Sequence, residues 1–495
     1  MSLPTSFFHN NVQLGGGGWA LLFSSANNMN SNGMRKSIRW QHTVGSGYVG
    51  MYEYGGSLTF GGLRMVKFAN DGTVENTWMR SLNNDHFEPR SFDVWGNGHT
   101  ISIAEAGGST FMMATDENGT IADTERLHSA SFGSGFIYGW SIEAIQKPLT
   151  GTGGLDANDR YFYFGASVTS GGEYKAYRGQ TWQAGEFVGI YQQNGITAGS
   201  NTIYPWRILY STSDGNSADG MISFGRNSGT FGQSSYFHSY DGGMTSTVYR
   251  QNIDVGQYND FDEIRDACWH NRPQGITNAN RRWYAVGQAQ NTSAYTPPFI
   301  MKGTASGYSS TIRAITRVNG STANGSTALG VEYDHVNGNR VYVIGYMNKP
   351  NDSTSTVKDG YCVCLNVTDD NGTAPTIEWA IAAEQLENGT RRNILFNSVS
   401  VDDEGCPIIN AMYTDGSQVE RPMVVRLAAD GSSTGVVNVS SNNNITLYDA
   451  TSLLQLTGLG QQSSSPGLTT GYSVNIADHT GTSPTGNITN TLVEI

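Results

Sequence analysis

The sequence has little charge and no clustered basic residues. Only 14% of its 495 residues are Asp, Glu, Lys or Arg, against roughly 25% in a typical globular protein. The net charge is −13, and basic residues occur as isolated pairs such as Arg281-Arg282. Because binding to phosphates needs grouped Lys and Arg, we expect no nucleic-acid partner. A surface of Ser, Thr, Asn and Gly suits packed assemblies and contact with sugars.

Cysteine is also scarce. A disulfide scaffold is shorter and richer in cysteine, and a structural zinc site needs a second close pair that this sequence lacks. Cys362 and Cys364 lie two residues apart on a predicted strand and therefore share one face. We predict four packed thiols, at Cys268, Cys362, Cys364 and Cys406, with no metal and no cofactor.

Long apolar runs and helical periodicity are missing as well. No window approaches the ~20 apolar residues of a membrane-spanning helix. The opening "MSLPTSFFHNN" has neither a basic start nor an apolar run, so we predict no secretion signal and synthesis in the cytoplasm. No apolar period of 3.6 residues persists along the chain, which favours an all-β protein.

What the sequence does contain is glycine, 62 residues in all, and an internal repeat. Each copy is an apolar strand, a turn with Asn or Asp before Gly, and a second strand that often carries Trp and Arg. Such turns tolerate positive φ and predict hairpins. They could also bind Ca²⁺ through oxygens, but no EF-hand loop is present. The copies lie at 61–82, 109–127, 186–209, 234–253, 298–318, 360–382 and 422–439, with a divergent copy at 18–44.

A second hairpin precedes several copies, as in the segments that end with 161–167, 283–289 and 341–347 and in 394–414. Two hairpins make a four-stranded antiparallel unit, and such units repeated at roughly 45–75 residues are typical of β-propellers. The sequence therefore predicts a seven- or eight-bladed β-propeller.

The two ends differ from the repeats. Residues 18–440 are predicted to form the propeller. Residues 1–17 are predicted to be a docking arm that ends in a flexible glycine joint, Gly15-Gly16-Gly17. Residues 441–495 are predicted to be a β segment that closes the ring or pairs with a partner. Since propellers usually close by pairing both chain ends, we expect 18–44 to complete a blade with part of 441–495.

The repeat pattern resembles the bacterial and phage β-propeller repeat family over roughly residues 18–440. The opening "MSLPTSFF…GGGGW" looks like the start of marine cyanophage and related phage structural proteins that carry these repeats. The resemblance implies a structural component of a tailed-phage virion, tail or fibre-associated, in multiple copies beside other virion proteins. The family motif carries no catalytic residues, so we expect no enzyme.

The acidic residues offer an alternative, a polysaccharide-degrading tailspike-type enzyme. Glycoside hydrolysis needs two carboxylates at a fixed separation, and the densest acidic cluster is Asp260, Asp262, Glu263 and Asp266. We interpret this cluster as a solvated loop. His270, near Asp266, has no nucleophile motif around it. The segment "SVDDEGCPI" at 400–408 approaches a sialidase box but lacks its Trp.

The aromatic residues divide into two groups. Trp40, Trp78, Trp206 and Trp379 recur in the repeats, and we interpret them as packing between blades. A second group lies in Gly-rich or polar segments that we expect to be loops, where exposed rings could stack on host-surface glycans. These candidate glycan contacts are Tyr174, Tyr177, Trp182, Tyr295 and Tyr308.

Overall fold

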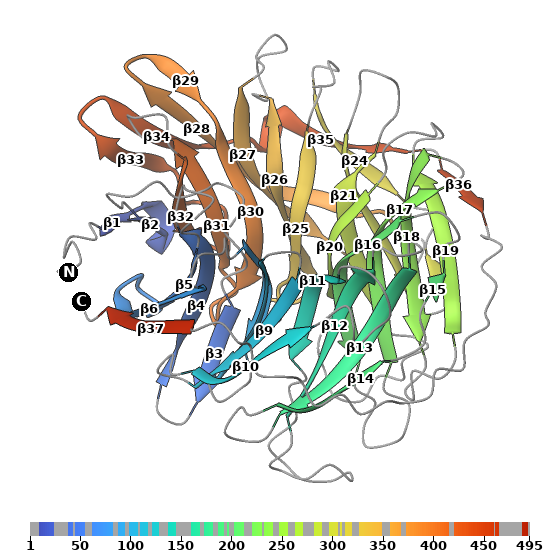
Figure 1. Cartoon of the computed structure of the whole chain (residues 1–495). Coiled ribbons are helices and arrows are strands. Elements are labelled where there is room, and N and C mark those ends of the chain that lie inside the picture. The colour runs from blue at the N-terminus through green and yellow to red at the C-terminus, as the bar shows by residue number, and fades with distance from the viewer. Residues whose placement is uncertain are drawn as a thin grey trace.

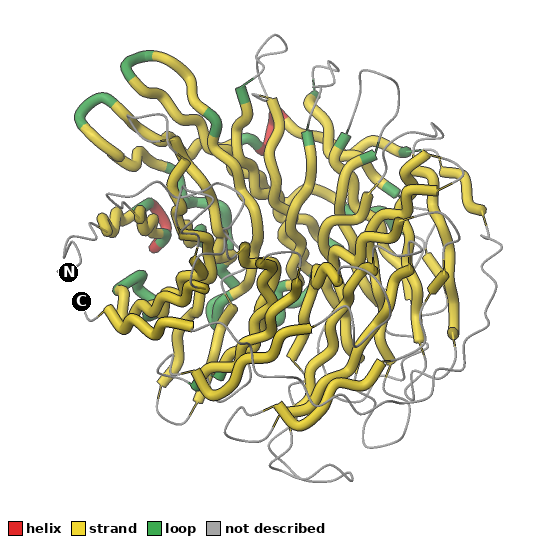
Figure 2. Tube along the Cα trace, viewed as in Figure 1, coloured by secondary structure: helices red, strands yellow, loops and turns green. Residues whose placement is uncertain are grey.

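A computed structural model of the chain describes most of the strands and many of the turns. Its described residues are 9–23, 38–42, 45–54, 62–82, 88–94, 99–106, 109–116, 121–127, 137–144, 160–168, 173–181, 187–192, 196–197, 202–211, 220–229, 232–240, 247–255, 263–270, 282–289, 297–304, 307–308, 312–318, 326–348, 357–367, 373–414, 420–459, 461–464 and 488–493. Strands dominate them, and the helical turns are the short η1 (Gly15–Gly17) and η5 (Thr451–Leu453) (Figure 2). A helix long and apolar enough to cross a membrane is not found there.

The described strands form seven sheets, which we number in the order of their first strands. Sheet 1 contains β3 (Ile38–His42), β4 (Gly45–Tyr54), β5 (Gly62–Phe68) and β6 (Val74–Leu82). Sheet 2 contains β7 (Glu88–Val94), β8 (Thr100–Ala106), β9 (Ser109–Thr115) and β10 (Ile121–Leu127). Sheet 3 contains β11 (Ile137–Ala144), β12 (Arg160–Val168), β13 (Glu173–Thr181) and β14 (Phe187–Gln192), with β15 (Ile196–Thr197) beside β13.

The next three sheets follow the same plan. Sheet 4 contains β16 (Thr202–Ser211), β17 (Gly220–Gly229), β18 (Gly232–Tyr240) and β19 (Thr247–Val255). Sheet 5 contains β20 (Glu263–Trp269), β21 (Arg282–Gln288), β22 (Pro298–Thr304) and β24 (Arg313–Arg317), with β23 (Gly307–Tyr308) beside β22. Sheet 6 contains β25 (Thr327–Tyr333), β26 (Arg340–Asn348), β27 (Lys358–Asn366) and β28 (Thr376–Glu387), with β29 (Thr390–Arg392) beside β28.

Sheet 7 draws its strands from both ends of the chain. Its order is β30 (Ile394–Val401), β31 (Pro407–Thr414), β32 (Glu420–Arg426), β2 (Trp19–Phe23) and β1 (His9–Gln13). The expected blade of 18–44 with part of 441–495 is wrong for residues 19–22, which pair with 423–426 instead. It is right for residues 38–42, which lie in the same sheet as 488–493. The N-terminal strand completes the sheet that the chain builds last.

The first strands of the seven sheets contact one another in a closed cycle. In order, β3, β7, β11, β16, β20, β25 and β30 each contact the next, and β30 contacts β3. The sheets thus radiate from a common axis with their fourth strands outermost (Figure 1). This arrangement confirms the predicted β-propeller. Seven is the count for the described strands, and the number of blades in the whole chain stays a prediction.

The repeat located most hairpins correctly. The copies at 61–82, 109–127, 234–253 and 360–382 are hairpins of the third and fourth strands of their sheets. The copies at 18–44, 186–209 and 422–439 instead join strands of two different sheets. A strand, a polar turn and a strand look alike in sequence whether the turn stays in one sheet or leads to the next.

The junction of sheets 7 and 1 is held by Trp19. Its side chain is 2% exposed, and its ring packs edge-on against Phe68 at 5.9 Å between centroids. The indole Nε1 donates a hydrogen bond to the carbonyl of Asn70 at 2.9 Å. The aromatic pair thus joins the N-terminal strand to the turn of the next sheet, which is where the ring closes.

The glycine run before Trp19 is a packed turn, so the predicted flexible joint is wrong. Leu14 N–H donates to the Gly18 carbonyl at 2.7 Å, and Ser433 Oγ donates to the Gly15 carbonyl at 2.9 Å. Gly16 has a backbone φ of 64°, a conformation that residues other than Gly rarely adopt. A Cβ on Gly18 would lie 2.7 Å from the Arg426 carbonyl oxygen. Glycine is needed here because the backbone of this turn lies close to the backbone of β32.

The C-terminal residues add strands to the outer edges of earlier sheets (Figure 1). We call β34, β35, β36 and β37 the C-terminal belt. β34 (Asn443–Asp449) pairs with β28 of sheet 6 and also with β33 (Gly435–Ser440). β35 (Leu454–Gly458) pairs with β24 of sheet 5, and β36 (Gln461–Ser464) with β19 of sheet 4. β37 (Ile488–Val493) pairs with β6 of sheet 1.

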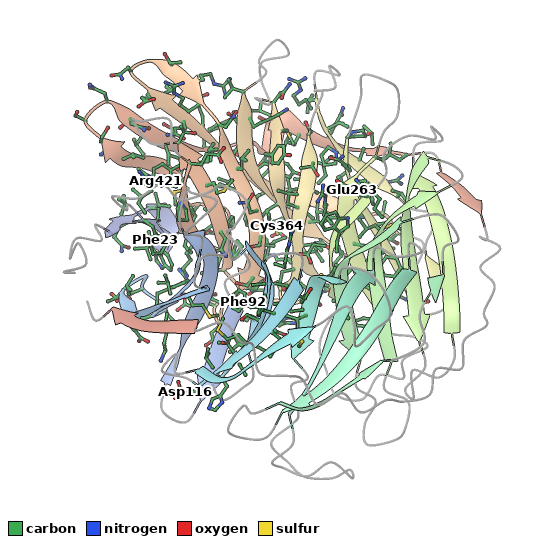
Figure 3. All side chains as sticks on the ribbon, in the orientation of Figure 1. Phe23, Phe92, Asp116, Glu263, Cys364 and Arg421 are labelled. Atoms are coloured by element: carbon green, nitrogen blue, oxygen red, sulfur yellow. The ribbon has the colours of Figure 1, made fainter. Side chains whose placement is uncertain are left out.

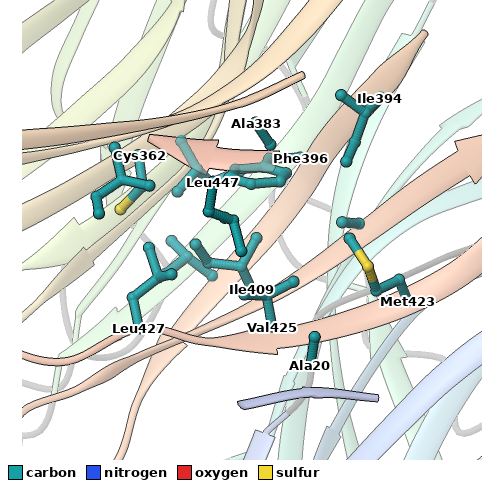
Figure 4. Close-up of a cluster of buried hydrophobic side chains, with 14 of the residues drawn as sticks. Ala20, Cys362, Ala383, Ile394, Phe396, Ile409, Met423, Val425, Leu427 and Leu447 are labelled. Atoms are coloured by element: carbon teal, nitrogen blue, oxygen red, sulfur yellow. The ribbon is translucent and has the colours of Figure 1, made fainter. Parts of the chain in front are cut away.

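Apolar side chains fill the wedges between neighbouring sheets. One cluster joins sheets 6 and 7 and includes Cys362, Ile409 and Val425, together with Leu447 of the C-terminal belt (Figure 4). A second cluster joins sheets 5 and 6. In this described part of the chain, neighbouring sheets bury their apolar faces against each other, as in a propeller.

Replacing Trp19 with Ala should destabilise the ring by about 3–5 kcal/mol, the usual effect of deleting a buried aromatic side chain. Trp19→Phe, which keeps an aromatic ring but loses the hydrogen bond to Asn70, should lose less. Chemical denaturation of both variants measures this. Equal stability of Trp19→Ala and the parent protein would show that the junction does not depend on this ring.

Candidate functional site

The axis is lined by strands that share a β-bulge. In six of the seven described first strands the register against the second strand slips at one place, and β3 is the exception. A bulge bends a strand and redirects its side chains. The bulged residues are Arg90, Trp140, the pair Pro205-Trp206, Arg265, Leu329 and Asn397.

Small residues on the second strands make room for the bulges. Ala104, Ala166, Gly287, Gly345 and Ala411 pair with the residue just before each bulge. In sheet 4, Gly225 lies opposite the two bulged residues. A Cβ on Gly287 would lie 1.8 Å from the Glu263 carbonyl oxygen, and one on Gly345 would lie 2.0 Å from that of Thr327. Glycine is required by this close approach.

At four successive steps, from sheet 2 to sheet 6, the residue that follows the bulge forms a hydrogen bond with the next sheet around the axis. Ser91 Oγ accepts from Ile142 N–H at 3.3 Å, Ser141 Oγ accepts from Ile208 N–H at 3.1 Å, Arg207 Nε donates to the Ala267 carbonyl at 3.2 Å, and Asp266 Oδ2 accepts from Val331 N–H at 3.0 Å. At the step from sheet 6 to sheet 7 this place belongs to Gly330, and a Cβ there would lie 3.2 Å from Ser398 Cα. In sheet 7 the equivalent residue is Ser398, whose Oγ has no hydrogen-bond partner among the described residues. We call the four bonds between sheets 2 and 6 the axial hydrogen bonds.

Two carboxylates of the predicted acidic cluster lie in this region, on β20. Glu263, labelled in Figure 3, is 2% exposed. Its Oε1 accepts a hydrogen bond from Arg265 Nε at 2.6 Å, and its Oε2 lies 3.6 Å from Arg226 Nη1. Asp266 Oδ1 lies 3.3 Å from Arg207 Nε. The predicted solvated loop is wrong for both residues, and Asp260 and Asp262 lie outside the described residues.

Aromatic side chains flank these ion pairs. The Arg265 guanidinium lies 4.5 Å from the centre of the Trp206 ring, a cation–π contact between sheets 5 and 4. Burial raises the pKa of Tyr346, which also responds to the charges of Arg265 and Glu263. The site combines three arginines, two carboxylates, an indole and a phenol. Such a group holds sheets together, and the Arg265 side chain within it is 31% exposed.

The four tryptophans of the repeat do not occupy one equivalent position, as the sequence had indicated. Trp40 and Trp206 lie on first strands, whereas Trp78 and Trp379 lie on fourth strands. Packing between sheets is confirmed for Trp379, which belongs to the cluster between sheets 6 and 7. Its Nε1 donates to the Ala429 carbonyl at 2.9 Å.

The candidate glycan contacts are distributed over three places. Tyr174 and Tyr177 lie on β13, paired with Ser167 and Phe164, so their expected placement in loops is wrong. Tyr308 lies on the two-residue strand β23 beside Gly303 of β22. Trp182 and Tyr295 lie outside the described residues. Their role in glycan contact stays a prediction.

Asp402, Glu404 and Cys406 offer ligand atoms within 4.8 Å of one another, the spacing of a metal site. The guanidinium of Arg426 already occupies the place of a cation: its Nε donates to Asp402 Oδ2 at 2.6 Å and its Nη2 to Glu404. Asp402 Oδ1 accepts from the N–H groups of Glu404 and Cys406. Arg426 Nη1 also donates to the Gly17 carbonyl at 2.9 Å. The cluster therefore fastens the N-terminal turn to sheet 7.

His270 follows β20 and is held between two tyrosines. Its Nδ1 lies 2.9 Å from the Tyr284 hydroxyl, and its ring centre lies 4.6 Å from that of Tyr333. Asp266 is engaged by Arg207 and Val331 of the neighbouring sheets. The contacts of both residues are those of strand packing.

All four cysteines are buried free thiols, as predicted. Cys362 and Cys364 lie on the same face of β27 and share the cluster between sheets 6 and 7. Burial raises the pKa of both thiols, and it raises the pKa of Cys406 to about 11. Neutral, enclosed thiols are poor nucleophiles and poor metal ligands.

No protein-family model and no curated protein matches the chain. Among solved structures, the propeller of Dos1 is similar at a TM-score of 0.41 and 8% identity, covering 84% of this chain and 95% of that one. A variant α-L-arabinofuranosidase from Fusarium graminearum in complex with an iminosugar inhibitor gives 0.38 and 10%, covering 68% and 92%. The Penicillium chrysogenum α-L-arabinanase complexed with arabinobiose gives 0.37 and 9%, covering 68% and 92%. These likenesses concern the fold alone.

Replacing Gly287 or Gly345 with Ala should cost about 1–3 kcal/mol, because the added Cβ forces the first strand away from the second. Gly389→Ala is the matched control: nothing lies within 4 Å of its added Cβ, so it should lose about 1 kcal/mol through backbone strain. Thermal and chemical denaturation compare the three. A larger loss at Gly389 than at Gly287 and Gly345 would contradict the steric argument.

The thiols should resist alkylation at pH 8 in the folded protein and react fully after denaturation. A pKa of about 11 leaves Cys406 almost entirely protonated at that pH. The raised pKa means that the folded state holds the thiol proton more tightly. Stability from this source is present below about pH 8.5, the pKa of a free thiol, and declines as the pH rises toward 11. Fast labelling of the native protein at pH 8 would contradict this.

Proposed function

We propose that the chain is a non-catalytic structural component of a tailed-phage virion, tail or fibre-associated, in which the propeller is a rigid platform for assembly. The observation that carries the proposal is the set of axial hydrogen bonds, which join sheets 2 to 6 through side-chain to main-chain contacts. The two axial carboxylates, Glu263 and Asp266, are likewise held in contacts between sheets. The repeat resemblance supplies the phage context.

Rigidity is the property that the structure supports best. The axial hydrogen bonds join the inner strands of sheets 2 to 6, and the pair Trp19–Phe68 holds the junction of sheets 7 and 1. The C-terminal belt extends the outer edges of four sheets. A ring held at its inner and outer edges keeps its loops in fixed relative positions. Fixed loops suit a platform that contacts other virion proteins in several copies and, as a second role, attaches to host-surface glycans.

The competing function is polysaccharide degradation, favoured by the presence of two carboxylates near the axis. Glycoside hydrolysis requires one carboxyl group that carries a proton and a second that attacks or activates water. Both oxygens of Glu263 face arginine side chains, and Asp266 is bound by Arg207 and by Val331 N–H. This geometry suits charged carboxylates in structural ion pairs better than an acid and a base.

A direct test incubates the protein with host envelope polysaccharide and follows both polymer length and co-sedimentation. If the protein is a structural platform, the length of the polysaccharide should stay unchanged. Co-sedimentation of the protein with the polysaccharide would support the role in glycan attachment. Glu263→Gln and Asp266→Asn should lower the melting temperature, because each leaves a guanidinium without its carboxylate. Polymer shortening that these two variants abolish would establish the enzyme instead.

The virion assignment is tested on particles. Cryo-electron microscopy or mass spectrometry of purified particles should find the chain in several copies at the tail or its fibres. Deleting residues 1–8, which leaves β1 and β2 intact, should reduce incorporation while the melting temperature stays unchanged. Particles that lack the chain altogether would overturn the assignment.

A further inference from the structure

The outer edges of the sheets are extended unevenly. Five sheets carry a strand beyond their fourth: β1 on sheet 7, β34 on sheet 6, β35 on sheet 5, β36 on sheet 4 and β37 on sheet 1. In the described part of the chain, sheets 2 and 3 end at β10 and β14. These two strands also contact each other. The two sheets without a fifth strand are thus neighbours, and they lie between the sheets that carry β36 and β37.

The C-terminal belt visits the sheets in reverse order. Its strands begin at Asn443, Leu454, Gln461 and Ile488. The first two steps, from sheet 6 to sheet 5 and on to sheet 4, take 11 and 7 residues. The step from sheet 4 to sheet 1 takes 27 residues, which is three steps of nine. Nine residues is the mean length of the first two steps. Three steps are needed to go from sheet 4 to sheet 1, because sheets 3 and 2 lie between them.

We propose that the outer edges of β14 and β10 are docking sites for the part of this same chain between Ser464 and Ile488, one strand on each edge. Every belt strand pairs antiparallel with the fourth strand of its sheet. An edge strand presents main-chain N–H and C=O groups that accept a further strand. β10 and β14 are the fourth strands of their sheets and present the same kind of edge.

The length of the intervening chain fits this occupant. Two residues separate β35 from β36, and four separate β34 from β35. The 23 residues from 465 to 487 therefore accommodate two strands of the lengths found in the belt, four to seven residues, with three such links. At nine residues per step, the strand on β14 would begin near residue 470 and the strand on β10 near residue 479. The alternating stretch 472–478 coincides with the first.

Hydrogen–deuterium exchange of the full chain tests the proposal. Alternate amides of β14 and β10 should be protected, and replacing 465–487 by a Gly/Ser linker of equal length should make them exchange about tenfold faster or more. Amides of β8 and β9 should keep their protection, which shows that sheet 2 still folds. Fast exchange at both edges in the parent protein, or no change in the linker variant, would overturn the proposal.

A point variant sharpens the assignment. Val474→Pro removes a main-chain donor and disfavours strand pairing at that place. It should release the amides of β14 and leave those of β10 protected, because the second strand lies further along the chain. Protection that survives the linker and rises with protein concentration would identify a second copy as the occupant and refute the proposal.

Discussion

The hydrogen bonds from one bulged first strand to the next are the interaction on which the arrangement of sheets 2 to 6 depends. Among the described residues, buried apolar clusters join sheet 4 to sheet 5, sheet 5 to sheet 6 and sheet 6 to sheet 7, so these sheets cover their apolar faces by packing on neighbours. Packing of apolar side chains is not directional, so it does not by itself set how far neighbouring sheets slide along each other. Side-chain to main-chain bonds such as Ser141 to Ile208 and Asp266 to Val331 set that register near the axis.

The chemistry of the axial region follows from the same constraint. In sheets 2 and 3 the residue after the bulge is Ser91 or Ser141, and its hydroxyl accepts a hydrogen bond from a main-chain N–H of the next sheet. In sheets 4 and 5 the equivalent residues are Arg207 and Asp266, so charge enters the interior and must be balanced. Arg226, Arg265 and Glu263 complete the balance. The residues that resemble a catalytic pair in sequence are thereby accounted for by sheet-to-sheet contact.

The fold could be predicted because its signals are local. Apolar alternation and Asn/Asp-Gly turns mark individual hairpins, and the hairpins repeat. The axial site could not be predicted from the sequence. Arg207 and Arg226 lie far from Glu263 in the chain and approach it only because sheets 4 and 5 pack together. One signal was present: a Gly after apolar residues in several second strands, as in "ISFG", "YAVG" and "YVIG". It marks the place where the first strand bulges.

Glycine at positions 15–18 shows why composition alone misleads. A run of glycines permits disorder, and it equally permits a backbone to lie against another without a Cβ between them. Ser432, Ser433 and Arg426 occupy the space that side chains on this run would need. The choice between the two outcomes is made by residues some 400 positions away.

The position of β2 has a consequence for synthesis. The segment Trp-Ala-Leu-Leu-Phe leaves the ribosome about 400 residues before its partner β32. At about 5–20 residues per second, that interval is on the order of 20–80 s. For all of that time five apolar residues, each buried in the finished protein, have no sheet to join. The hairpin of β1 and β2 must therefore be kept from associating with other chains until β32 of sheet 7 has been synthesised.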